Sequence, residues 1–171
     1  MKYSALLIAL APAFAFAQSA SPILNFEGEI TNLTCNVAVN GNTSSPQIAL
    51  NPAKVADLAT PGATAIPTPF TMTLSGCDNS STANIKLVPT AITASGNLKN
   101  LLTTGQANNV NMQLYNNGGT LALTSAAGVN VPVVIANGTA TSQFGVRYVA
   151  EGGSAGEGLV KSSVQYAISY Q

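Results

Sequence analysis

Apolar and polar residues alternate along much of the chain, which is the pattern of strands with one buried face. In one run, Phe70, Met72 and Leu74 alternate with threonine, and Gly76-Cys77 follows. Comparable alternations occupy residues 24–30, 85–87, 110–114, 121–123, 131–135, 144–149 and 164–170. Seven or eight strands at this short spacing predict an all-β sandwich.

Turn-forming residues separate these runs. The segment Asn116-Asn117-Gly118-Gly119 predicts a hairpin whose second strand is 121–123. Asn137-Gly138 divides two later strands, and the glycine-rich segment 152–158 precedes the last one.

Residues 46–69 contain five prolines and predict a loop that crosses between two sheets. Within this loop, Asn51 suits the N-cap of a helix and Pro52 suits its first position. We therefore expect a single helical turn from Lys54 to Leu58, which Pro61-Gly62 would end.

The N-terminus has the three parts of a secretory signal peptide. Lys2 supplies a basic start, residues 5–14 are apolar, and Ala15-Phe16-Ala17 fits the small-x-small cleavage rule. A membrane anchor is the alternative, but Pro12 interrupts the run, which is shorter than the roughly 20 residues of a membrane span. We expect residues 1–17 to be removed during export and Gln18 to begin the mature chain.

The amino-acid composition argues against several classes of function. A length of 171 residues suits one domain, and only 7% of the residues are charged, against roughly 25% in an average soluble chain. With 6 basic and 6 acidic residues, the chain lacks the basic surface of a nucleic-acid-binding protein. It also contains no His and no Trp, which argues against hydrolases and zinc enzymes. We expect no catalytic, cofactor-binding or metal-binding residues.

Two cysteines, Cys35 and Cys77, follow the export signal. A catalytic thiol would need a basic partner such as His, and two thiols alone do not complete a zinc site. An exported chain meets an oxidising compartment, so an intramolecular disulfide is the prediction.

Three segments carry a family resemblance. They are Asn-Phe-Glu-Gly-Glu-Ile at 25–30, about five residues before Cys35, then Phe-Thr-Met-Thr-Leu-Ser-Gly-Cys at 70–77, and Tyr-Ala-Ile-Ser-Tyr-Gln at 166–171. Together with the leader and the cysteine pair, their order and spacing resemble the type 1 fimbrial (chaperone–usher) pilin subunit family. The resemblance covers the whole mature chain.

The resemblance implies an incomplete immunoglobulin-like β-sandwich that lacks its final strand and is completed by a donor strand from a neighbour. Residues 18–30 would be the donor-strand extension and residues 31–171 the pilin domain. The donor side chains would be Leu24, Phe26, Gly28 and Ile30. The acceptor groove and chaperone-binding strand would present Val164, Tyr166, Ile168 and Tyr170.

The same resemblance implies the partners: neighbouring pilin subunits, a periplasmic chaperone and an outer-membrane usher. The chain would pass through the periplasm to the bacterial surface and form part of a fimbria used in cell adhesion. No nucleic acid is expected as a partner, and no cofactor.

Two other functions are compatible with parts of this sequence. A minor adaptor or tip-associated adhesin subunit of the same pilus would share these features. A classical adhesin, however, would need an additional N-terminal lectin domain, and we expect the mature chain to hold only one domain. A secreted β-sandwich enzyme is disfavoured because the sequence offers no acid–base group of residues.

Overall fold

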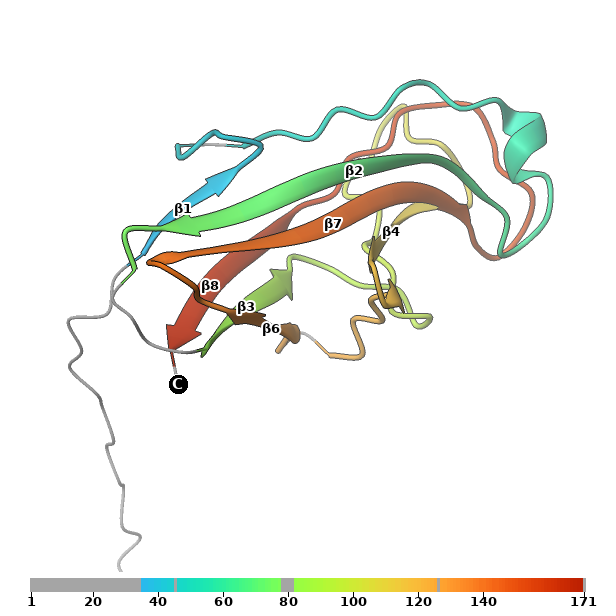
Figure 1. Ribbon diagram of the computed structural model, residues 1–171. Helices are drawn as coiled ribbons and strands as arrows, with labels where there is room; N and C mark the ends of the chain where they lie inside the picture. Colours follow the sequence, from blue (N-terminus) through green and yellow to red (C-terminus); the bar gives the residue numbers. More distant parts are fainter. Residues whose placement is uncertain (1–34, 45, 78–81, 126, 171) are drawn as a thin grey trace, which may run out of the picture. The chain divides into compact units, whose positions relative to one another are not determined.

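A computed structural model describes residues 35–170, except 45, 78–81 and 126 (Figure 1). All of these belong to one compact unit, Thr31–Gln171. The expected signal peptide 1–17 and the expected extension 18–30 lie outside the described residues. No helix in the described part of the chain is long and apolar enough to cross a membrane.

The described chain contains eight strands and one 3-10 turn, joined by loops, so the prediction of an all-β protein is confirmed. The strands are β1 (Asn36–Val39), β2 (Thr64–Ser75), β3 (Thr82–Pro89), β4 (Val110–Asn116), β5 (Gly119–Thr120), β6 (Val129–Val134), β7 (Thr139–Ala150) and β8 (Val164–Tyr170). They form an antiparallel five-stranded sheet in the order β1-β2-β7-β4-β5 and an antiparallel three-stranded sheet in the order β6-β3-β8.

The long strands β2 and β7 lie side by side and form the centre of the larger sheet (Figure 1). Phe70 and Phe144 are direct cross-strand partners, and their rings stack with centroids 5.6 Å apart. Aromatic pairs of this kind stabilise a sheet beyond the area they bury. The β6–β7 turn uses Asn137 and Gly138 at positive φ (52° and 72°), as a type I′ hairpin requires.

The core lies between the inner faces of the two sheets. Alternate residues of β3 are buried, with Ala83 and Ile85 at 0% exposure and Leu87 at 2%. They meet Met72, Leu74 and Leu114 from the larger sheet in one hydrophobic cluster. A smaller cluster around Leu58, Ala107 and Ala150 lies at the η1 end.

The proline-rich segment differs from the prediction in two ways. The chain from β1 to β2 joins two neighbouring strands of one sheet and does not cross between sheets. It also ends earlier, because β2 begins at Thr64 and includes Pro67 and Pro69. The strand tolerates them through an irregularity: its register shifts between Ala65 and Thr68, where Ile66 has a φ of 53°.

The helical turn is present but shorter than predicted. It is the 3-10 turn η1 (Val55–Leu58), its N-cap is Lys54 rather than Asn51, and no side chain caps it. Asn51 and Pro52 lie before the turn, in irregular chain.

The second strand of the predicted hairpin is shorter than predicted and comes earlier, before residues 121–123. It is β5, with two residues, and the turn is reduced to Asn117-Gly118. After β5, the Leu121 amide still bonds to the Leu114 carbonyl of β4 at 2.9 Å, but the Leu123 amide bonds to the Gly96 carbonyl at 3.0 Å, so the chain leaves the hairpin for a neighbouring loop after Leu121. Tertiary hydrogen bonding explains this departure from the alternating pattern.

Candidate functional site

β8 is one of the two edge strands of the smaller sheet, and β6 is the other. β8 pairs with β3 along one edge, and no other strand in the described ranges pairs with its second edge. The backbone N–H and C=O groups along that edge are available to a further strand, which is a liability that folded proteins usually protect against.

An apolar groove accompanies this open edge. Its central part is a hollow of about 500 Å³ between the chain that follows β1 and the start of β8. Core side chains Met72, Leu87 and Leu114 contribute to its lining, so the interior of the sandwich is reached through it. Its rims are Pro46–Leu50 on one side and Val160–Val164 on the other.

A second hollow of about 500 Å³ continues the groove toward η1. The two hollows share Ile48, Leu50, Met112 and Val160 in their linings. Tyr148 lines the second hollow, and burial raises the pKa of its phenol above the ordinary value. The groove is therefore long, apolar along its floor, and bordered by main chain, a shape that suits an extended peptide better than a compact ligand.

The four residues predicted on β8 share one face of the strand. Val164, Tyr166, Ile168 and Tyr170 are half-buried and pack against the main core cluster, whereas Gln165, Ala167 and Ser169 are exposed. Val164 and Tyr166 belong to the lining of the groove. Ile168 and Tyr170 follow them along the same face, towards the end of the strand.

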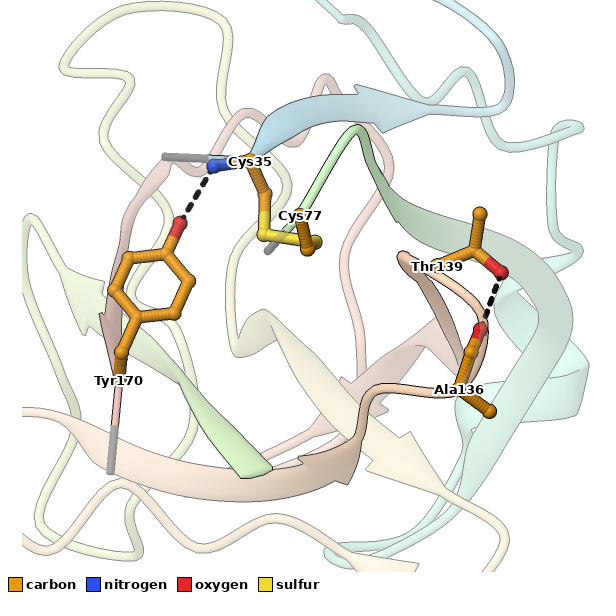
Figure 2. The surroundings of a disulfide bond; sticks show 5 residues. All are labelled: Cys35, Cys77, Ala136, Thr139 and Tyr170. Carbon is orange, nitrogen blue, oxygen red and sulfur yellow. Dashed lines mark hydrogen bonds between the residues drawn. A yellow bond between two sulfur atoms is a disulfide. The ribbon is translucent and has the colours of Figure 1, made fainter. Parts of the chain in front are cut away.

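The end of β8 is joined to the start of β1, as Figure 2 shows. The backbone N–H of Cys35 donates a hydrogen bond of 2.8 Å to the Tyr170 hydroxyl oxygen. In the same place the predicted disulfide between Cys35 and Cys77 is present, with an S–S bond of 2.03 Å. The disulfide ties the start of β1 to the residue after β2 within the larger sheet, and the hydrogen bond ties it to the end of β8 in the smaller sheet.

The remaining predicted site residues are not described. Leu24, Phe26, Gly28 and Ile30, the predicted donor side chains, lie outside the described residues. The rim formed by Pro46, Ile48 and Leu50 was not predicted, because this segment was expected to be only a loop. The alternation of Ile48 and Leu50 with Gln47 and Ala49 was the available signal.

The main polar cluster lies away from the groove, around Glu151. Its carboxylate accepts hydrogen bonds from the Thr93 hydroxyl (3.1 Å) and from the side-chain amides of Asn97 (2.9 Å) and Asn111 (2.6 Å). Within the described ranges, no group of three or more His, Cys, Asp or Glu residues is placed to hold a metal ion. Glu151 therefore fastens the loop that carries Thr93 and Asn97 onto β4.

Comparisons with known proteins identify the family. The model of the fimbrial protein family matches residues 24–171. The F17 fimbrial protein of Escherichia coli is 33% identical over 162 residues, which cover 86% of each chain. The type-1 fimbrial protein A chain of Escherichia coli strain K12 is 30% identical over 153 residues, which cover 86% of this chain and 82% of that protein. The chain belongs to the fimbrial protein family.

The fold of this fimbrial subunit agrees with that assignment. A chain from the solved structure of a chaperone–usher pilus is similar with a TM-score of 0.63 at 15% identity, over 94% of this chain and 100% of that one. The sandwich is therefore of the immunoglobulin-like pilin type, and the chain is a subunit of a fimbria, an appendage of the bacterial surface.

Proposed function

We propose that this subunit polymerises by donor-strand complementation through the groove beside β8. The N-terminal extension of the next subunit, residues 18–30, would lie along the open edge of β8. Its side chains Leu24, Phe26 and Ile30 would fill the groove, and Gly28 would allow a close approach of the two backbones. The single observation that carries the proposal is the open β8 edge above a groove lined by core residues.

Physical chemistry favours such an arrangement. Burying Leu24, Phe26 and Ile30 would contribute roughly 2 kcal/mol each, and each main-chain hydrogen bond to β8 would add about 1 kcal/mol. Donor and acceptor surfaces differ, so the contact does not close on itself and extends into a filament.

The same surface would also bind the chaperone and the usher before the subunit is assembled. We propose that a periplasmic chaperone covers β8 after export and that an outer-membrane usher exchanges it for the donor strand. The chain would have no catalytic activity, because its family is one of structural fimbrial proteins. A minor adaptor would use the same groove. Electron microscopy of cells lacking this gene separates the two roles, since only loss of a major subunit removes the whole shaft.

The test is a complementation experiment on the purified mature subunit, residues 18–171. A synthetic peptide of residues 19–30 should raise its melting temperature strongly. The matched control peptide carries Leu24→Asp, Phe26→Asp and Ile30→Asp, and it should have no effect because it would place charges in an apolar groove. If the subunit lacking residues 18–30 is a stable monomer whose melting temperature neither peptide changes, its sandwich is complete and the proposal is wrong.

A further inference from the structure

The two described sheets end in four edge strands that differ in length. The larger sheet ends in β1, with four residues, and in β5, with two, and edges this short offer few backbone groups to another chain. β2 extends past the end of β1 over residues 64–70 and carries Pro67 and Pro69 there. The smaller sheet ends in β8, with seven residues, and in β6, with six. β6 and β8 are therefore the two longer edge strands.

A proline stands in the middle of β6. Pro132 lies opposite Asn84 of β3 in the register of the sheet, and its side chain is exposed. Opposed residues in an antiparallel pair alternate between pairs that exchange two N–H···O bonds and pairs that exchange none. Because Pro132 has no N–H, its pair with Asn84 is one that exchanges none, and its ring nitrogen faces the free edge of β6.

The same alternation determines which other backbone groups β6 presents to its free edge. Asn130 and Val134 lie two positions away on either side of Pro132, so their N–H groups face that edge as well. Pro132 removes the donor between them, and its ring occupies the place where the hydrogen would point. A strand laid along β6 would therefore leave one of its own carbonyls unpaired at the centre of the contact.

The free edge of β8 has no such interruption. Each residue of β3 directs its N–H and C=O to one neighbour, so the residues that do not bond to β6 bond to β8. The backbone groups that face the free edge of β8 are then those of Val164, Tyr166, Ile168 and Tyr170. None of the seven residues of β8 is a proline. The start of β8 also lines the groove, whereas the residues of β6 line neither of its hollows.

Apart from Pro132, the sequence of β6 favours pairing with other strands. Residues 129–135 read Val-Asn-Val-Pro-Val-Val-Ile, with five β-branched side chains and no charge. No charged residue occurs between Lys99 and Arg147, so β6 lacks the charged side chains that protect many edge strands. Val134 is 71% exposed. Without its proline, this segment would have the composition of those that associate edge to edge.

We propose that Pro132 blocks strand addition at β6 and so makes β8 the one edge at which the subunit accepts a donor strand. This inference rests on the proposed function and names the residue that limits each subunit to one acceptor edge. A subunit with two acceptor edges would join two further chains, and a linear fibre would become branched or bundled. One blocked edge and one open edge keep growth in a single line.

The experiment measures self-association of the purified mature subunit, residues 18–171, in an excess of the 19–30 peptide, which fills the groove beside β8. Sedimentation velocity gives the dissociation constant of any dimer. The variants Pro132→Thr and Pro132→Ala restore the missing N–H. One control, Gln143→Thr, places threonine at an exposed position of the inner strand β7. The other, Pro132→Thr/Asn130→Pro, moves the proline two positions along the same edge.

Pro132→Thr should dimerise with a dissociation constant at least about tenfold below that of the wild type, because an antiparallel pair of β6 strands regains one hydrogen bond from each copy. Pro132→Ala should show the same change to a lesser degree, since alanine has a lower strand propensity. Gln143→Thr should match the wild type. The double variant should return close to it, because the outward row again lacks one donor while Val134 stays exposed.

Other results would overturn particular steps. If circular dichroism shows Pro132→Thr and Pro132→Ala to be folded and neither associates more than the wild type, Pro132 does not block the edge. If neither variant folds, Pro132 is required for the fold itself and its assignment is equally wrong. If the double variant associates as strongly as Pro132→Thr, the exposed apolar side chains drive the contact and the missing N–H does not. If the 19–30 peptide does not raise the melting temperature of the wild type, the proposed function fails, and β8 is not the acceptor edge whatever Pro132 does.

Discussion

Removing the disulfide should destabilise the subunit by an amount that the structure allows us to estimate. Cys35 and Cys77 are separated by 42 positions in the sequence, and their bond closes a loop of that length. In the chain-entropy model, a bridge of this span stabilises the folded state by about 4 kcal/mol, because it restricts the unfolded chain. The perturbation is the double substitution Cys35→Ala/Cys77→Ala.

Other contacts in the folded state compensate only partly for the loss of the disulfide. Without the bridge, β1 is held to β2 by four residue pairs and to Tyr170 by one hydrogen bond. Val39 of β1 belongs to the lining of the groove, so loosening β1 also loosens the groove wall. We therefore expect lower stability and a weaker response to the donor peptide in the same variant.

Urea unfolding followed by circular dichroism checks the magnitude. With a slope of about 2 kcal/mol per molar urea for a domain of this size, the midpoint should fall by roughly 2 M. The reduced wild-type protein, with both thiols confirmed by mass spectrometry, should match the variant. An unchanged midpoint in both samples would mean that the bridge does not constrain the unfolded chain, and the estimate would be refuted.

Three further changes test other parts of the structure. Gly28→Leu should leave the subunit able to fold on its chaperone but unable to donate its strand; fibres of normal length under the electron microscope would contradict this. Tyr170→Phe removes the acceptor of the Cys35 N–H and should cost about 1 kcal/mol in urea unfolding; an unchanged midpoint would show that water replaces the hydroxyl. Gly128→Ala should cost a few kcal/mol, because Gly128 has a φ of 83° and a Cβ there would meet the Leu87 carbonyl. Gly105→Ala, at a φ of 65° in open space, should cost only about 1 kcal/mol; equal losses would refute the steric argument.

Strands that bury one face could be predicted, because burying every second residue requires apolar and polar residues to alternate along the sequence. In β3, exposure alternates residue by residue, and Ile85 and Leu87 fill the core while Lys86 between them is only partly covered. The same holds for β8, whose alternation survives at an open edge. Such strands could be predicted from the sequence because each inward position is apolar.

Elements fixed by contacts between distant residues were not predictable in this way. β1 is only four residues long, and its conformation is set by pairing with β2 and by the disulfide. The pairing of β2 with β7 likewise carries Thr64 and Ala65 into a strand despite the prolines that follow. The alternation at Ile48 and Leu50 indicates an apolar face, but it does not specify a groove, which depends on residues 160–164 lying opposite.

The geometry of the two chain ends bears on where a donor strand comes from. Cys35, the first described residue, is bonded to Tyr170 at the end of β8, so the segment before Cys35 starts at that end of the groove. An antiparallel donor matched to the seven residues of β8 places residue 30 at the opposite end, about 20 Å away. The link from residue 30 to residue 35 spans at most about 18 Å when fully extended. A subunit therefore cannot fill its own groove in the antiparallel direction without strain, and insertion in the parallel direction pairs less stably. Complementation by a neighbour avoids both costs, which favours a chain of subunits over a closed monomer.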